Sequence, residues 1–301
     1  MEKIKLILDT DIGDDIDDTF ALILLSAIQE AEVLGVTTVY RNVKERGAIA
    51  RATCDTYRKN YDIYYGENNP LKEPIRHFSF DKINEDGTIR IPLLLDNMKV
   101  ISNEKKDGVD FIIDCVKSNP KEVSILAIGP LTNVATAILK CPEIVKDVKE
   151  LIIMGGDSTG DYNEWNIRCD PEAADVVLRS GIPIRMIGID VTKKCIIPEN
   201  IVEKIENNKA HELLNESLKI WRKNTKKPNP ALHDAVALAT IFGDYCQFEE
   251  RNVTVVLDGE DRAKTISGKV GSKVKFATDV YLDKFFEFVD NCLSNACKKN
   301  S

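Results

Sequence analysis

Residues 9–18 read DTDIGDDIDD, which places six carboxylates in ten positions. The segment lies between an apolar run at residues 4–8 and an apolar stretch at residues 20–28, which predict a buried strand and a helix. In open α/β sheets, ligands bind in the crevice beyond the carboxyl ends of the strands, so this acidic turn occupies the expected position of a binding site. The simpler alternative is that the aspartates complement a helix dipole, although one or two would be enough for that purpose.

The crowding of these carboxylates predicts a bound cation. Neighbouring carboxylates raise one another's pKa values, so packing them together is costly unless a cation neutralises them. The segment contains neither histidine nor cysteine, which disfavours zinc and copper. Oxygen ligands select a hard cation, which leaves calcium and magnesium.

Outside the acidic segment, short β-branched runs alternate with helical patterns over most of the chain. This alternation predicts an α/β fold with a mostly parallel central sheet flanked by helices, and we expect one domain spanning residues 1–301. Residues 67–106 interrupt the alternation with prolines, asparagines and little periodicity, so they are predicted to form a surface loop. Residues 253–257 and 274–280 are expected to form an antiparallel pair.

Composition excludes several classes of partner. The chain has 41 basic and 49 acidic residues, a balance that argues against a protein whose main task is to bind a nucleic-acid backbone. No apolar stretch approaches the roughly 20 residues that a membrane-spanning helix needs, so we expect no membrane partner. The eight cysteines include no CxxC pair, which suits reduced thiols and predicts a cytoplasmic location.

Six blocks of sequence, in order along the chain, resemble the nucleoside hydrolase family. The blocks are 9–18 (DTDIGDDIDD), 35–42 (GVTTVYRN), 127–133 (AIGPLTN), 154–174 with its MGG, EWNI and DPEAA motifs, 233–238 (HDAVAL) and 276–280 (FATDV). Together they span nearly the whole chain, from residue 9 to residue 280. The resemblance implies the single-domain nucleoside hydrolase fold and an enzyme that uses a calcium-activated water to split ribonucleosides into ribose and free base. It also implies a role in ribonucleoside catabolism or in purine and pyrimidine salvage.

The resemblance implies a set of metal ligands and a general base. Asp11, Asp18, Asp234 and the main-chain oxygen of Ile128 would hold calcium, which accepts about 6 to 8 oxygen ligands and so leaves room for water and ribose. A metal lowers the pKa of its bound water, and Asp11 would take the proton as the water attacks.

The resemblance also implies which side chains bind the sugar. Asp17, Asn42, Glu164 and Asn166 are candidates for ribose hydroxyls, and carboxylates facing the ring would stabilise the oxocarbenium-like transition state. The acidic turn is two residues longer than in the shortest family members, so Asp15 could take the place of Asp17. Tyr40 and Arg41 precede Asn42 where the family carries small residues, which is expected to narrow the pocket.

Three further residues are candidates for contacts with the base. His233 stands beside Asp234 at a predicted helix start and could protonate the leaving base. The alternative is that it caps the helix or bonds to a loop. Trp165 and Trp221 could stack on the base, although a large aromatic residue more often packs in the core.

Two other functions remain open at this stage. A magnesium-dependent phosphatase of the haloacid dehalogenase type also begins with a strand and Asp-x-Asp, but it does not require the later motifs. A non-catalytic nucleoside- or ribose-binding protein could retain the same scaffold. The sequence does not select a purine or a pyrimidine base, and we expect a homo-oligomer, either a dimer or a tetramer.

Overall fold

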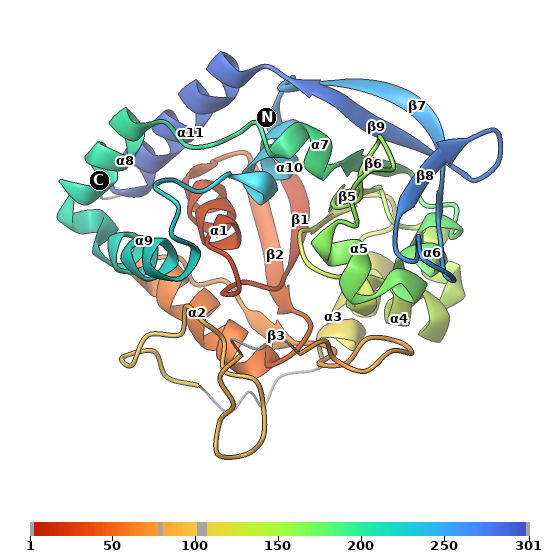
Figure 1. Cartoon of the computed structure of the whole chain (residues 1–301), viewed down its shortest axis with the longest axis horizontal. Helices are drawn as coiled ribbons and strands as arrows, with labels where there is room; N and C mark the ends of the chain where they lie inside the picture. The colour runs from red at the N-terminus through yellow and green to blue at the C-terminus, as the bar shows by residue number, and fades with distance from the viewer. Residues whose placement is uncertain (1–2, 78–80, 101–106, 299–301) are drawn as a thin grey trace.

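In a computed structural model, residues 3–77, 81–100 and 107–298 are described, and their strands form one nine-stranded sheet with helices on both faces (Figure 1). The strand order is β3-β2-β1-β4-β5-β6-β9-β7-β8. The parallel part consists of β1 (Ile4–Thr10), β2 (Ala31–Thr38), β3 (Ile63–Tyr65), β4 (Val123–Ala127), β5 (Glu150–Met154) and β6 (Ile184–Ile187). The last three strands are β7 (Cys246–Val255), β8 (Thr265–Gly268) and β9 (Ser272–Val280), of which β9 pairs parallel with β6 and antiparallel with β7.

The helices form two layers. One face of the sheet is covered by α1 (Asp17–Ala27), α2 (Val43–Thr56), α7 (Ile189–Thr192), α8 (Glu199–Glu206), α9 (Glu212–Thr225), α10 (His233–Phe242) and α11 (Leu282–Ala296). The other face is covered by α3 (Gly108–Ser118), α4 (Thr132–Lys140), α5 (Trp165–Cys169) and α6 (Pro171–Leu178). Short 3₁₀ turns are η1 (Pro142–Lys146) and η2 (Lys209–His211).

The first strand shows why the sheet carries a core on each face. Side chains of a strand alternate between its two faces, and Leu6 and Leu8 pack into the core beneath α1 and α10, whereas Ile7 packs into the opposite core beneath α3 and α4. Because both faces are covered, all three side chains are buried. A continuous apolar run is therefore the pattern expected of such a strand.

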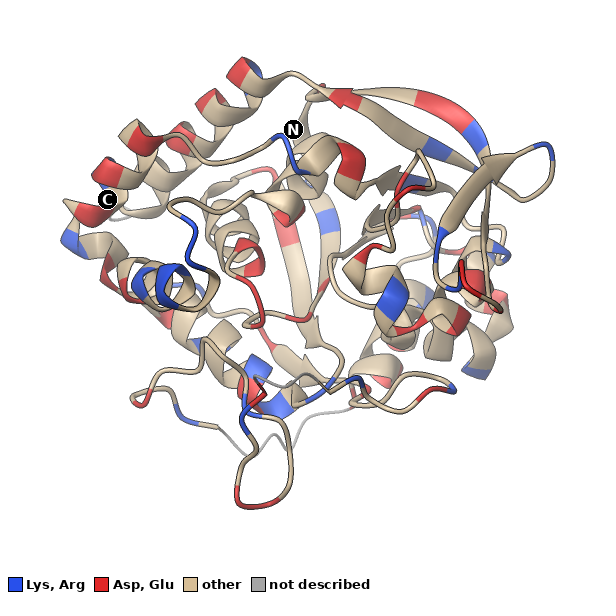
Figure 2. Ribbon diagram, in the orientation of Figure 1, with Lys and Arg blue, Asp and Glu red and all other residues tan. Residues whose placement is uncertain are grey.

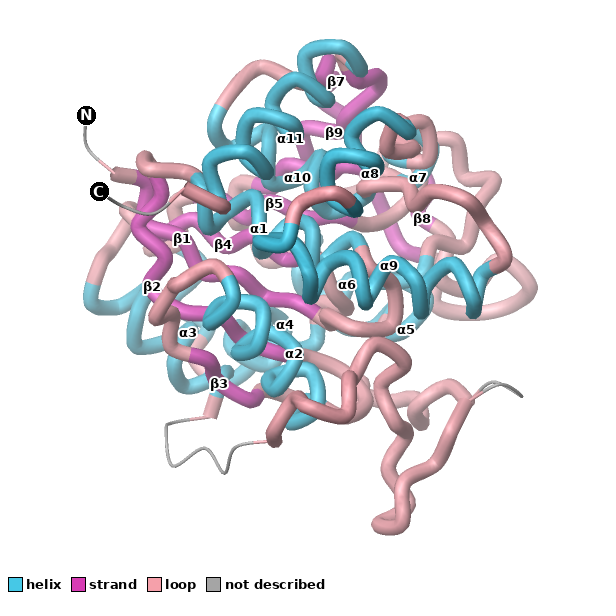
Figure 3. The backbone as a smooth tube through the Cα atoms, turned by 90° about the vertical axis from the view of Figure 1, so that its left-hand side faces the viewer, coloured by secondary structure: helices cyan, strands magenta, loops and turns pink. Residues whose placement is uncertain are grey.

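The structure confirms the expected fold class and refines it at the end of the chain. The antiparallel pair predicted from residues 253–257 and 274–280 is present, but β7 is longer than expected and β8 was not predicted. Within residues 67–77 and 81–100 the structure has no helix, and only an isolated bridge joins Ile83 and Ile89. Part of this loop projects away from the sheet (Figure 3). The remainder of the predicted loop, at 78–80 and 101–106, lies outside the described residues.

None of the helices in the described part of the chain is long and apolar enough to cross a membrane.

Candidate active site

A cavity of about 390 Å³ lies beyond the carboxyl ends of the parallel strands. It is lined by Asp11, Asp14, Asp15, Asp17, Asp18, Arg41, Pro92, Ile128, Met154, Glu164, Trp165, Asn166, Ile189, His233 and Asp234. The volume falls within the range of small-molecule sites, and acidic positions gather in the turn between β1 and α1 that forms one wall (Figure 2). The sequence expectation of a site at this edge of the sheet therefore agrees with the geometry.

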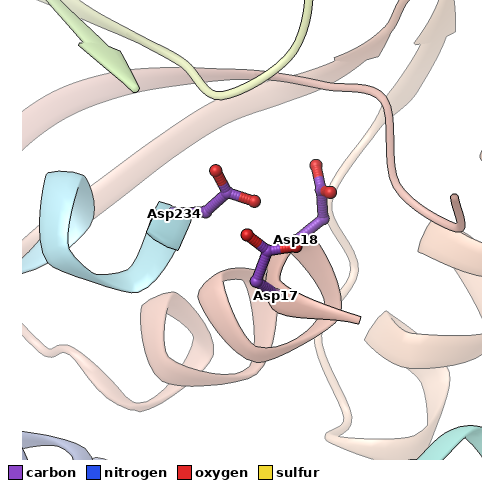
Figure 4. A group of neighbouring side chains, drawn as sticks. All are labelled: Asp17, Asp18 and Asp234. Atoms are coloured by element: carbon purple, nitrogen blue, oxygen red, sulfur yellow. The ribbon is translucent and has the colours of Figure 1, made fainter. Parts of the chain in front are cut away.

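Three carboxylates from two helices converge in this cavity. Asp17 and Asp18 occupy the first turn of α1, and Asp234 occupies the first turn of α10 (Figure 4). One carboxylate oxygen from each lies within 4.8 Å of the others, and the residues are only 6%, 4% and 2% exposed. Among the described residues these three form the one group of metal-ligating side chains this compact. The compact set thus contains Asp17 in addition to the predicted Asp18 and Asp234, whereas the predicted ligand Asp11 lines the cavity but is not part of this set.

Burial and mutual repulsion make this cluster costly to ionise. Burial is the main cause that raises the pKa values of Asp17, Asp18 and Asp234 well above the ordinary range, and the neighbouring carboxylates raise them further. Burial also raises the pKa of Asp11 to about 7, although the Arg46 guanidinium opposes this shift. A divalent cation would remove the penalty, and a donor set of carboxylates with one carbonyl fits a hard cation such as calcium or magnesium.

A buried arginine shapes the acidic turn. The Arg46 guanidinium of α2 donates to the main-chain oxygens of Asp11 and Ile12 and, at 2.8 Å, to the carboxylate of Asp14. The Asp14 carboxylate therefore forms an ion pair with Arg46 and is not part of the three-carboxylate cluster. No sequence signal distinguished Arg46 from a solvated helix arginine, so sequence reasoning missed this contact.

Two glycines allow the chain to pass close to the site. Gly13 has φ +113°, and a Cβ there would approach side-chain atoms of Ile49 and Ile91 to about 2.4–2.5 Å. At Gly129 a Cβ would lie 2.8 Å from the main-chain nitrogen of Asp11. Only glycine fits at both positions without displacing neighbouring atoms. The absence of a side chain at Gly129 lets the turn after β4 lie against the turn after β1.

Asp15 is held by a residue distant in sequence. Its Oδ1 atom accepts hydrogen bonds of 2.6 Å from the Trp221 indole and from the Ile16 main-chain nitrogen. Asp15 is exposed at the cavity, whereas Trp221 is buried in the core and does not line the cavity. The sequence did not determine whether Asp15 or Asp17 faces the sugar. The geometry brings Asp17, and not Asp15, together with Asp234.

Glu164 and Asn166 line the cavity at the start of α5. Glu164 caps α5 and accepts hydrogen bonds from the main-chain nitrogens of Asn166, Ile167 and Gly156 at 2.9–3.0 Å. The Asn166 amide donates at 2.9 Å to the main-chain oxygen of Ile128, which is itself a predicted metal ligand. The structure thus brings together all of these predicted residues.

Asn42 lies outside the set of cavity-lining residues. It caps α2, where it accepts from the Glu45 main-chain nitrogen at 3.3 Å and donates to Thr88 at 3.1 Å. Tyr40 and Arg41 before it have φ values of 69° and 63°. This left-handed turn brings Arg41 to the cavity wall, where its guanidinium lies 5.7 Å from the centre of the Trp165 ring.

His233 is the first residue of α10 and lines the cavity. Its Nδ1 atom lies 2.7 Å from the Thr192 hydroxyl, which leaves Nε2 available for a ligand. The preceding residue, Leu232, holds the N-cap position without a side-chain bond, so His233 is not a helix cap. Burial lowers the pKa of His233, which favours the neutral imidazole.

The chain is similar to known proteins over almost its whole length. The family model described as inosine-uridine preferring nucleoside hydrolase matches residues 6–287. The pyrimidine-specific ribonucleoside hydrolase RihB of Escherichia coli O9:H4 (strain HS) is 28% identical over 319 residues, which cover 99% of each chain.

Solved structures show the same likeness. A purine-preferring ribonucleoside hydrolase from Gardnerella vaginalis is 28% identical, with a TM-score of 0.83 over 98% of this chain and 99% of that chain. A plant nucleoside hydrolase, PpNRh1, is 26% identical, with a TM-score of 0.81 over 96% and 98% of the two chains.

Proposed function

The chain belongs to the inosine-uridine preferring nucleoside hydrolase family and is a nucleoside hydrolase; from this premise we propose how its own residues cleave a ribonucleoside. The proposed reaction splits the N-glycosidic bond by attack of a water activated at a calcium site. The observation that carries this proposal is the convergence of Asp17, Asp18 and Asp234 in the cavity that also contains Asp11.

The metal ligands proposed for this chain come from three separate segments. Asp11 and Asp18 from the β1–α1 turn, Asp234 from α10 and the main-chain oxygen of Ile128 would hold the cation. When bound, calcium would lower the pKa of a coordinated water and so supply a nucleophile near neutral pH. The fit rests on the buried carboxylates, whose ionisation requires a positive charge nearby.

Asp11 is proposed as the general base. It is buried in the acidic turn and lines the cavity together with Asp17, Asp18 and Asp234. Arg46 fixes the main chain at this residue, so the carboxylate has a defined position. Asp11 would accept the water proton as the bond to the sugar forms.

Asp17, Glu164 and Asn166 are proposed to bind ribose hydroxyls. All three line the cavity and are buried, so a hydroxyl bound there would replace water as their partner. The negative charges of Asp17 and Glu164 would also stabilise the positive charge that develops on the sugar as the bond breaks.

The base is proposed to lie toward His233 and Trp165. His233 is held through Nδ1 by Thr192, so Nε2 would donate a proton to the departing base after the imidazole is protonated. Trp165 and Arg41 form the adjoining wall, and Asp15 lies at the same cavity. The relative from Escherichia coli is described as pyrimidine-specific and that from Gardnerella vaginalis as purine-preferring. The proposal therefore covers both classes of ribonucleoside.

A panel of ribonucleosides tests the proposal, with released ribose measured in EDTA and with calcium or magnesium added back. We expect ribose only with a divalent cation, and no ribose from Asp11→Asn under any condition. A protein that binds ribonucleosides calorimetrically but releases no ribose would be a binding protein. Phosphate release from phosphomonoesters without base release would instead indicate a phosphatase.

A further inference from the structure

A second depression, separate from the candidate active site, lies at the amino ends of the parallel strands. It encloses about 1580 Å³ and is lined by the start of β1, the segment before β2, and the carboxyl ends of α2 and α11. Among its lining residues are Tyr57 and Cys297. The proposed hydrolysis of ribonucleosides uses none of these residues.

A cysteine, a histidine and a tyrosine form a hydrogen-bonded chain at this depression. The Cys297 thiol sulfur lies 3.2 Å from Nε2 of His211 and 3.7 Å from Nδ1, and the Tyr57 hydroxyl lies 2.7 Å from Nδ1. His211 is 3% exposed and Tyr57 is 5% exposed, so both are held by the fold. A nucleophile, a base within hydrogen-bond reach and a third group that orients the base are the parts of an activated nucleophile.

In the resting protein, both the Cys297 thiol and the His211 imidazole are neutral. Partial burial raises the pKa of the Cys297 thiol, and burial lowers the pKa of His211. The thiol is therefore protonated at neutral pH while the imidazole is free to accept a proton. Such a thiol reacts only when the neighbouring base removes its proton during attack.

Cys297 differs in its surroundings from the other cysteines of the described chain. All the others are buried except Cys115, which is half-buried like Cys297. Among the described residues, no histidine forms a hydrogen bond with Cys115. Burial raises the pKa of the Cys115 thiol to about 11. Cys297 and His211 are not part of any described group of three metal-ligating residues, which disfavours a zinc site. Because the Cys115 side chain is half-buried like that of Cys297, Cys115 is a control for the effect of solvent exposure on thiol reactivity.

The depression carries an excess of positive charge. Its charged lining residues are Lys3, Glu30, Glu32, Arg58, Lys59 and Lys298, four basic and two acidic. Fixed cations raise the local concentration of small anions. An anionic reagent is therefore favoured over a neutral one.

We propose that Cys297 is a thiol-modification site at which a small anionic disulfide exchanges with the thiol, with His211 as general base and Tyr57 as its positioning residue. The Cys297 sulfur attacks one sulfur of the disulfide, the bond between the two reagent sulfurs breaks, and a mixed disulfide forms. The thiol proton passes to Nε2 of His211 and from there to solvent, or to the departing thiolate where that group is basic enough to take it. The reagent disulfide is the oxidant, and its second half leaves as a reduced thiol.

The experiment measures the second-order rate of reaction of the folded protein with dithiobis(nitrobenzoate), a dianionic disulfide whose released thiolate is coloured. We expect one thiol to react rapidly in the wild type and in Cys115→Ser, and this fast phase to disappear in Cys297→Ser. His211→Gln should slow the fast phase about ten-fold or more. Tyr57→Phe, which removes only a hydroxyl, should slow it several-fold, and the neutral dithiodipyridine should lose less rate than the dianion when salt is added.

The pH profile separates a general base from a purely structural histidine. The groups in hydrogen-bond contact with the pair are Tyr57, which caps α2, and Asn208 from the turn before η2. The charged groups that line the same depression are those named above. In the wild type the rate should be flat around neutral pH, because His211 is already neutral there. In His211→Gln it should rise about ten-fold per pH unit, because only the thiolate reacts.

Two results would overturn the proposal. One is a fast phase that persists in Cys297→Ser. The other is a wild-type rate and pH profile in both Tyr57→Phe and His211→Gln, with unchanged thermal midpoints showing that both variants are folded.

Discussion

Replacing Asp234 by asparagine should affect the stability of the metal-free enzyme and its activity in opposite directions. Asp234 lies within 4.8 Å of both Asp17 and Asp18. At that distance, and with an effective dielectric constant of about 20, two like charges repel by about 3 kcal/mol. The metal-free protein avoids this repulsion by keeping a proton on the cluster, and holding it at pH 7 on a group of ordinary pKa 3.8 costs about 4 kcal/mol relative to the unfolded chain. Asparagine needs no such proton.

The sign of the pH dependence follows from the raised pKa values of the cluster. A group whose pKa is higher in the folded state binds more protons there, so stability falls as pH rises above its unfolded value of 3.8. Asp234→Asn removes one such group. In EDTA we therefore expect the variant to be about 4 kcal/mol more stable than the wild type at pH 7, and only about 1.5 kcal/mol more stable at pH 5.

Urea unfolding followed by tryptophan fluorescence measures these differences. With calcium at about 100 times its dissociation constant, the wild type should gain about 2.7 kcal/mol and the variant much less. The variant should also release no ribose. Asp170→Asn is the matched control, because Asp170 is a buried aspartate that caps α6 and bonds to Thr132. The Asp170→Asn substitution should lower the free energy of unfolding by the same amount with and without calcium. An Asp234→Asn variant that is less stable in EDTA by the same amount at both pH values would refute the argument from charge repulsion.

Three further predictions concern the walls of the cavity. Trp221→Phe removes the indole donor to Asp15 and part of a buried side chain, so it should lower kcat/KM about ten-fold in steady-state kinetics and also lower the thermal midpoint. Asn166→Ala should lower kcat/KM about 100-fold or more, because the amide that bonds to the Ile128 oxygen is lost together with a proposed ribose contact. Deoxynucleosides should be cleaved at least 100-fold more slowly than ribonucleosides in a competition assay, and comparable turnover of deoxyinosine would contradict the proposed hydroxyl contacts.

Local patterns predicted the fold because they depend on neighbours in sequence. Alternating apolar runs and helical stretches identified the parallel strands, and the antiparallel pair near the end was found in the same way. β8 was missed because three of its four residues are exposed, which leaves no apolar pattern to detect. Asn42, which was expected to bind the sugar, caps α2 in the structure, a role that its neighbours in sequence did not indicate.

Within the candidate site, the sequence located the acidic residues but not the side chains that bind them. The run of acids indicated a cation, but four carboxylates after Gly13 offered several registers. Arg46 binds Asp14 and Trp221 binds Asp15, which leaves Asp17 and Asp18 to meet Asp234. No pattern near residue 14 could reveal partners that lie in α2 and α9.

By itself, the sequence determined that the chain is an α/β protein with an acidic turn at the end of its first strand, since burial and backbone periodicity are encoded residue by residue. Only the tertiary structure decided which acids share one cavity with Asp234, and that Arg41 lines it while Asn42 does not. The physical reason is that side-chain direction in an irregular turn is set by contacts with distant segments. Those contacts exist only after the sheet and its helices have packed together.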